Sequence, residues 1–118
     1  MIYSYSNLLN RKVKIKKNLR TNERLKYMDN FKIISINYKK CNHKVLGIDI
    51  SISGIGFLSE HIMEKNDLVE AIFKYKNITI PATIKVNHIN LSDKGYYIGG
   101  QFIALKNTYR EILKHELL

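Results

Sequence analysis

Two short polar clusters in the chain have the residue types needed to hold an anionic or nucleotide ligand. The first places Arg20 and Arg24 four residues apart, and the second is the run Asp49-Ile50-Ser51-Ile52-Ser53-Gly54. A planar guanidinium donates paired hydrogen bonds to phosphate oxygens or to the O6 and N7 atoms of guanine, which a lysine ammonium does not imitate. Because the chain is rich in lysine and poor in arginine, the arginine pair indicates a specific contact with phosphate or guanine.

The second cluster offers complementary groups for a guanine nucleotide. The carboxylate of Asp49 is an acceptor that suits the N1 and N2 donors of guanine. Ser51 supplies a short hydroxyl at the end of an expected strand, and Gly54 lets the backbone turn closely beneath a ligand. A lone Asp-x-Ser is usually a turn or a cap, and a lone arginine pair is usually a solvated surface, so only the combination is informative.

The combination resembles the PilZ domain, a bacterial receptor for cyclic di-GMP, whose signature is Arg-x-x-x-Arg followed by Asp/Asn-x-Ser-x-x-Gly. Both halves are complete, and the resemblance covers residues 18–118. Family members also tend to carry a glycine shortly before a phenylalanine in the last strand, which Gly99-Gly100-Gln101-Phe102 matches. The resemblance implies a six-stranded barrel, a terminal helix and a site for cyclic di-GMP.

Carried over residue by residue, the resemblance implies these ligand-binding positions: Arg20, Arg24, Asp49, Ser51 and Gly54. Rim contacts are expected from Lys17, Asn18, Leu19, Ser53 and Gly100. The residue before the first arginine influences in the family whether one ligand or a stacked pair is held. A leucine at this position adds no charge for a second ligand, which favours one ligand per chain.

Length and composition predict a single domain without a cysteine-based metal site. The 118 residues suffice for one hydrophobic core, and Cys41 is the only cysteine, so no intramolecular disulfide forms and a reducing cytoplasm fits. The net charge of +10 predicts a surface attractive to nucleotides, nucleic acid, acidic proteins or anionic lipid. No apolar run is long enough for a membrane span or a signal peptide, so we expect a cytoplasmic protein.

The pattern of the chain predicts a mainly β fold, a small six-stranded antiparallel barrel of the split type. Residues 1–17 form a basic N-terminal arm, in which alternation in 12–16 suggests a short strand, and residues 18–118 form the barrel domain. The expected strands are 31–38, 45–51, a strand beginning at Gly54, 68–75, 78–89 and 96–105. Because Pro81 has no amide proton, we expect it at an edge or a bulge of the strand 78–89. A turn at 39–43 makes the first pair a hairpin about Cys41, which returns Ser51 to the neighbourhood of Phe31.

The C-terminal segment changes to helical periodicity. Tyr109, Ile112, Leu113 and Leu117 fall on one face of a helix expected over about 108–117. Thr108-Tyr109-Arg110-Glu111 has the form of a capping box. A helix of about three turns is marginal alone, so its apolar face should pack on the barrel or on a partner.

Catalytic and metal-binding motifs are missing from the sequence, which predicts a protein that is not an enzyme. The histidines lie far apart along the chain without ligand spacing, namely His43, His61, His88 and His115. There is no phosphate-binding loop with the Gly-x-x-x-x-Gly-Lys pattern, and Ser51 and Ser53 lie outside any nucleophile-elbow motif. We therefore expect no catalytic residue, no metal and no cofactor, the ligand being cyclic di-GMP.

The favoured interpretation is a non-enzymatic effector in which the arginine arm closes over cyclic di-GMP and changes a partner-binding surface. The family implies a partner in motility, polysaccharide or pilus machinery, and a role in motility or biofilm regulation. The first alternative is a basic RNA or single-stranded DNA module of the OB type, with stacking surfaces at Tyr27, Tyr38, Tyr75, Tyr96 and Tyr97. Its affinity would fall steeply with salt and rise with oligonucleotide length. The second alternative is a protein-interaction domain without useful ligand affinity.

Overall fold

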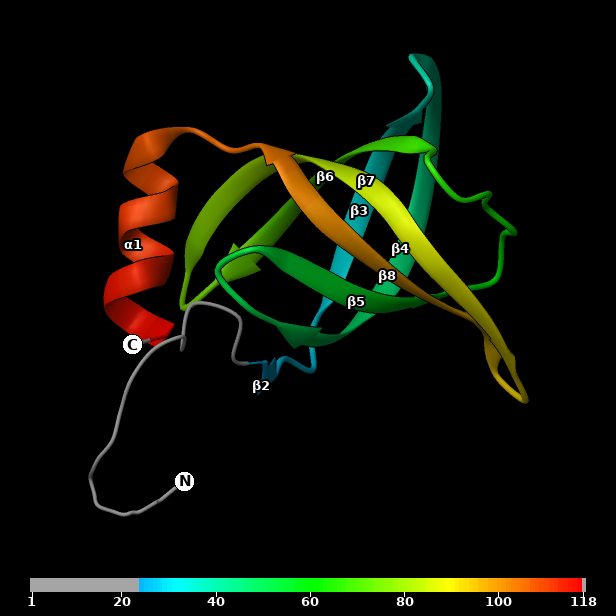
Figure 1. The fold of residues 1–118 in the computed structure, drawn as a ribbon, viewed down its shortest axis with the longest axis horizontal. Helices are drawn as coiled ribbons and strands as arrows, with labels where there is room; N and C mark the ends of the chain where they lie inside the picture. The colour runs from blue at the N-terminus through cyan, green and yellow to red at the C-terminus, as the bar shows by residue number, and fades with distance from the viewer. Residues whose placement is uncertain (1–23, 118) are drawn as a thin grey trace.

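The computed structural model describes residues 24–117, which form a closed antiparallel β-barrel with one helix beside it (Figure 1). The strands are β2 (Leu25–Lys26), β3 (Asn30–Ile36), β4 (Lys39–Ile50), β5 (Gly54–Ser59), β6 (Leu68–Tyr75), β7 (Ile78–Ser92) and β8 (Gly95–Ala104). The order β4-β3-β6-β7-β8-β5 is closed by pairing of β5 with β4, and the two-residue β2 is added to the edge of β4. The predicted six-stranded barrel is confirmed, while the predicted arm at 1–17 lies outside the described residues.

The barrel interior is filled by alternating apolar side chains, among them every phenylalanine of the chain. In β3, buried and exposed residues alternate strictly, so Phe31 and Ile33 point inward. The ring centroids of Phe31 and Phe57 lie 5.3 Å apart, and the stacked rings of Phe73 and Phe102 lie 5.7 Å apart. This packing across the barrel joins strands that are distant in sequence and fixes their faces, because a one-residue slip would expose the apolar set.

The first hairpin differs from the prediction. Its turn is Asn37-Tyr38, and the predicted turn at 39–43 is instead the first half of β4. Asn37 and Tyr38 have φ angles of 51° and 70°, the left-handed pair required by a two-residue hairpin turn. The Asn37 side chain stabilises this turn by accepting a hydrogen bond from the Leu68 amide at 2.9 Å. The earlier turn shifts the register, so Phe31 pairs with Val45 rather than approaching Ser51.

The remaining strand predictions agree with the structure to within a few residues, and the expectation for Pro81 is confirmed. Pro81 pairs with Ile72 of β6, while the ladder between β7 and β8 begins only at Thr83. Proline has no amide proton to donate, so it is tolerated where one side of the strand is unpaired. The sequence pattern therefore located both the strands and the point at which one of them is an edge.

The predicted helix is α1 (Asn107–Leu117), which stands at one end of the barrel (Figure 1). Its inward residue Leu113 is fully buried and belongs to the barrel core. The predicted capping box is wrong, because the Lys106 carbonyl accepts hydrogen bonds from the amides of Tyr109 and Arg110, both at 3.0 Å. The helix thus begins before Thr108, which lies within its first turn rather than at the cap.

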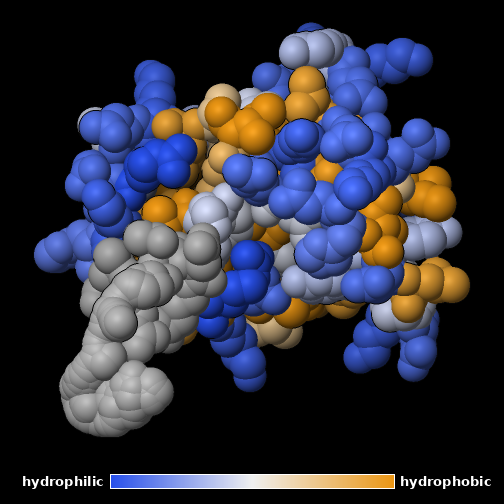
Figure 2. Space-filling view, in the orientation of Figure 1, coloured by the Kyte–Doolittle hydropathy of each residue, from blue (hydrophilic) through white to orange (hydrophobic). Residues whose placement is uncertain are grey.

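Figure 2 shows that one face of the molecule is mostly hydrophilic, with apolar side chains in scattered groups. The most exposed large apolar residues are Met28, Tyr38, Ile62 and Leu91. They belong to different loops and strands. Within residues 24–117, no helix combines the length and the hydrophobicity that crossing a bilayer would take.

Tyr27 anchors the segment after β2 to the barrel, and its ionisation should lower the free energy of unfolding at alkaline pH. Its hydroxyl donates to the Lys74 carbonyl. Burial, with a contribution from the Asp29 carboxylate, raises the pKa of Tyr27 to about 12. Because the folded-state pKa exceeds the unfolded value, this contribution is complete below about pH 10 and is lost as the pH rises towards 12.

We therefore expect the stability advantage of the wild type over Tyr27→Phe to shrink by about 2 kcal/mol between pH 10 and pH 12. Urea unfolding of both proteins at matched pH values measures this difference, and lysine titration is common to both. A constant difference across that range would contradict the assigned pKa of Tyr27.

Candidate functional site

The short strand β2 brings the arginine motif against the aspartate motif. Leu25 pairs with Ile50 and Lys26 with Asp49, which places Arg24 beside the end of β4. The Arg24 guanidinium donates to Asp49 Oδ1 from Nε at 2.7 Å and from Nη2 at 2.6 Å. Its Nη1 lies 3.4 Å from Ser51 Oγ. The register shift at the first hairpin makes this meeting possible, because the end of β4 then lies opposite residues that precede β3.

Ser51 organises the turn between β4 and β5. Its amide donates to the Gly54 carbonyl at 2.9 Å, and its hydroxyl accepts from the Gly54 amide at 3.2 Å. The same hydroxyl is 3.2 Å from the Ser53 amide and from the Ser53 hydroxyl. Ser51 is fully buried, so its hydroxyl stabilises the turn that follows Asp49 rather than facing open solvent.

Gly54 is required by the close approach of β5 and β8. A Cβ atom at this position would lie 2.1 Å from the carbonyl oxygen of Gly100. Gly100 is itself buried and pairs with Ile55, the residue that follows Gly54. The two glycines therefore let the strand that follows the Ser51 turn pack directly on β8, which fixes the turn relative to the barrel.

Tyr97 on β8 is a member of this cluster that the sequence analysis treated only as a stacking surface for nucleic acid. Its hydroxyl donates to Asp49 Oδ2 at 3.0 Å, so the Asp49 carboxylate is held by Arg24 on one oxygen and by Tyr97 on the other. Burial, followed by the hydrogen bond to Asp49 and its charge, raises the pKa of Tyr97. In the sequence, Tyr97 is marked only by its position two residues before Gly99. This spacing places the two residues on the same face of β8.

Of the predicted ligand-binding residues, the structure brings together Arg24, Asp49, Ser51 and Gly54. Among the predicted rim residues, Ser53 lies in the same turn and its carbonyl accepts from the Phe102 amide at 2.8 Å. Gly100 lies beneath Gly54 and is buried. Arg20, Lys17, Asn18 and Leu19 lie outside the described residues.

The described residues contain one histidine pair that the sequence spacing did not predict. The rings of His43 on β4 and His61 after β5 stack with their centroids 3.8 Å apart. Within residues 24–117, no group of three or more His, Cys, Asp or Glu side chains is arranged to hold a metal ion. The pair is therefore a packing contact between two histidines in this part of the chain.

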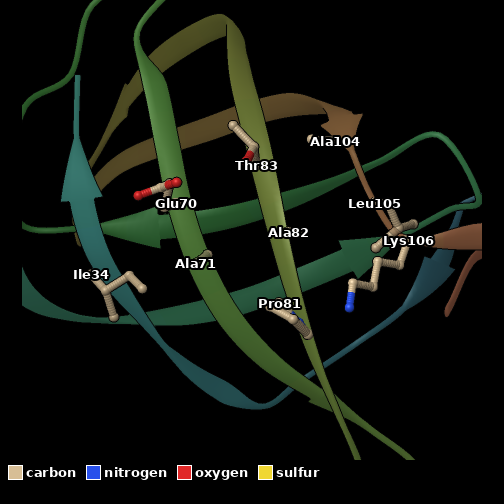
Figure 3. Close-up of a pocket in the computed structure, with 9 residues that line it drawn as sticks. All are labelled: Ile34, Glu70, Ala71, Pro81, Ala82, Thr83, Ala104, Leu105 and Lys106. Atoms are coloured by element: carbon tan, nitrogen blue, oxygen red, sulfur yellow. The ribbon is translucent and has the colours of Figure 1, made fainter. Parts of the chain in front are cut away.

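A pocket of about 310 Å³ lies between the middle of the barrel and the link from β8 to α1 (Figure 3). Its wall includes Ile34, Glu70, Pro81 and Lys106. None of the residues that line it belongs to the arginine or aspartate motifs. The Glu70 carboxylate accepts a hydrogen bond from the Ser35 hydroxyl at 2.6 Å, so its charge is engaged within the barrel wall.

Comparison with known proteins adds a family and a fold relative. The PilZ domain family matches residues 18–118. A solved structure of the Bacillus subtilis inhibitor of motility (MotI/DgrA) superposes with a TM-score of 0.65 at 12% sequence identity, over 80% of this chain. The matched region is 47% of that chain, so the present chain spans about half of its length. No curated protein matches the chain significantly.

Proposed function

Because this chain belongs to the PilZ domain family, a family of non-enzymatic receptor domains for cyclic di-GMP, we propose that it binds cyclic di-GMP around Arg24, Asp49 and Ser51. The observation that carries the proposal is the direct contact between the two halves of the family signature. Arg24 from the first half donates to Asp49 from the second half at 2.6 Å and approaches Ser51. Residues separated by 25 positions thus form one cluster.

The ion pair between Arg24 and Asp49 is suited to a ligand that offers both an anion and a pair of donors. A phosphate can replace the carboxylate as the partner of the guanidinium, while guanine N1 and N2 donors replace the guanidinium at the carboxylate. Neither charge is then left unpaired, so the exchange avoids a large desolvation cost. The side chains of Arg24 and Asp49 are 39% and 25% exposed, so both remain accessible to such a ligand.

The second arginine of the signature gives the proposal its effector mechanism. Arg20 would contact the same ligand from the segment before β2, and binding would draw that segment against the barrel. A ligand shifts a population only through its different affinity for the two states, so a partner that prefers the closed segment would respond to cyclic di-GMP.

The partner would be a protein of motility, polysaccharide or pilus machinery in the cytoplasm. The fold relative is an inhibitor of motility, which favours motility among the three. The alternative of a nucleic-acid module loses one of its stacking residues, because Tyr27 is buried in the core.

The test is calorimetric titration of the full chain with cyclic di-GMP, with GMP as the control ligand. The double variant Arg20→Ala/Arg24→Ala should lose binding. The matched control Lys26→Ala/Lys32→Ala removes the same charge at two exposed positions and should retain it. Absence of heat and of thermal stabilisation by cyclic di-GMP, in a folded wild-type sample, would reject the proposal. A stronger response to long oligonucleotides that falls steeply with salt would favour the nucleic-acid alternative.

A further inference from the structure

The tip of the hairpin between β3 and β4 carries an aromatic ring that the barrel does not use. Tyr38 is 81% exposed, and of the six tyrosines that the structure describes it is the only exposed one. Its phenol makes no hydrogen bond or ring contact with any other residue in 24–117. Figure 1 shows this turn at one extremity of the molecule, away from α1. The ring therefore gains almost nothing from burial in its own protein.

The backbone also makes tyrosine an unfavourable choice at this position. The φ angle of Tyr38 is 70°, in the left-handed region where a Cβ atom crowds the following carbonyl oxygen. The turn between β6 and β7 has the same form, because Lys76 and Asn77 have φ angles of 49° and 70°. Its second position holds asparagine, which tolerates this conformation. Tyr38 instead strains its turn and leaves a ring in water, which points to a contact outside the barrel.

Two lysines without acidic partners follow the ring. Lys39 and Lys40 begin β4, both are exposed, and neither forms an ion pair with a carboxylate in residues 24–117. The Asp67 carboxylate accepts a hydrogen bond at 3.0 Å from the side chain of the first residue of the turn. One carboxylate beside two ammonium groups leaves the tip positive. At the turn between β6 and β7, by contrast, Lys76 is paired with Glu116 at 2.7 Å.

A protruding ring next to free lysines suits the surface of a bilayer with anionic headgroups. Tyrosine is enriched at the level of the headgroups, because its ring is apolar and its hydroxyl remains hydrated. Lysines near an anionic leaflet are attracted to its negative surface potential. Single-stranded nucleic acid is instead bound along a groove in which successive bases stack on several rings, whereas this turn offers one ring on a convex tip.

We propose that the turn at Asn37-Tyr38, together with Lys39 and Lys40, attaches the barrel to an anionic lipid surface. The 12-residue strand β4 separates this tip from Asp49 near its other end, a distance of roughly 30 Å along the strand. Lipid at the tip would therefore leave the signature cluster open to its ligand. The inference goes beyond the proposed function and does not depend on it, because the contact requires no cyclic di-GMP.

A single indole at the tip reports this contact directly. The chain contains no tryptophan, so Tyr38→Trp introduces the only one. Vesicles of equimolar phosphatidylcholine and phosphatidylglycerol, added to the full chain, should shift its emission saturably to shorter wavelength, because the indole enters a less polar layer. Vesicles of phosphatidylcholine alone should not. The matched control Asn77→Trp places the indole at the same position of the other turn, and its emission wavelength should not change.

Co-sedimentation with the anionic vesicles measures what each group contributes. Lys39→Gln/Lys40→Gln should weaken binding by about 10-fold or more. Lys74→Gln/Lys106→Gln removes the same charge at two exposed positions elsewhere and should bind within about 3-fold of the wild type. Tyr38→Gly should weaken binding and yet raise the Tm, because glycine is favoured in left-handed backbone. A lower Tm would show that Tyr38 has a structural role, which would contradict the argument from strain.

The membrane contact is rejected if the wild type does not bind the anionic vesicles, or if it binds no better than Lys39→Gln/Lys40→Gln. It is also rejected if the emission of Tyr38→Trp responds to poly-glutamate or to a single-stranded oligonucleotide but not to vesicles. Those responses would assign the tip to an acidic protein or to nucleic acid. All these measurements are made without cyclic di-GMP, so they are independent of the titration that tests the proposed function.

Discussion

Arg24→Lys is expected to weaken cyclic di-GMP binding by about tenfold or more, although the substitution preserves the positive charge. The Arg24 guanidinium presents Nε and Nη2 to Asp49 and directs Nη1 towards Ser51. A lysine ammonium is a compact charge that does not reproduce this planar set of donors towards phosphate or guanine. The affinity from calorimetric titration measures the loss.

The matched control for this variant is Lys26→Arg, the reverse exchange on the same short strand, which should leave the affinity unchanged. The Arg24–Asp49 pair is partly exposed, so Arg24→Lys should change the free energy of unfolding by less than about 1 kcal/mol. Loss of binding would then reflect recognition rather than unfolding. An unchanged affinity for Arg24→Lys would show that binding requires only a positive charge at this position.

Gly54→Ala is expected to destabilise the protein by about 3 kcal/mol, the upper part of the usual range for overpacking. The new Cβ would lie 2.1 Å from the Gly100 carbonyl oxygen, which is backbone and cannot rotate away. The strands β5 and β8 would have to separate, and the Ser51 turn would move with them. Urea unfolding measures the loss of stability, and the thermal shift with cyclic di-GMP measures the loss of binding.

Gly99→Ala provides the matched control for Gly54→Ala. The three heavy atoms nearest to its Cβ would all belong to the ring of His88, at 2.2 to 2.9 Å, and His88 is an exposed side chain. Because the imidazole can rotate into solvent, the cost should be below about 1 kcal/mol. Equal destabilisation by the two substitutions would show that contact with backbone is not what makes Gly54 necessary.

The strands were predictable because they depend on local patterns that burial enforces. Alternation of Phe31, Ile33 and Ser35 marks one face of a strand, and the observed β6 has the predicted bounds at 68–75. Pro81 was assigned correctly to an unpaired edge because it has no amide proton. The helix was predictable from the spacing of Tyr109 and Leu113.

The first hairpin was not predictable from the same patterns. Asn37 and Tyr38 lack the glycine that usually marks a tight turn. Their left-handed conformation depends partly on two hydrogen bonds of the Asn37 side chain, which donates to Asp67 and accepts from the Leu68 amide. The lysines at 39 and 40 suggested a loop, yet they face solvent at the start of a strand. This error shifted the expected register between β3 and β4.

The sequence by itself determined the residue types of the candidate site and the family to which the chain belongs, because both depend only on the residues of two short motifs. Only the tertiary structure decided how those motifs meet. The turn at Asn37-Tyr38 sets the register that brings Asp49 opposite Lys26 and beside Arg24, and barrel closure brings Tyr97 of β8 to the same carboxylate. These contacts depend on strand pairing between distant segments, and the geometry of such pairing follows from packing of the whole barrel rather than from any local run of residues.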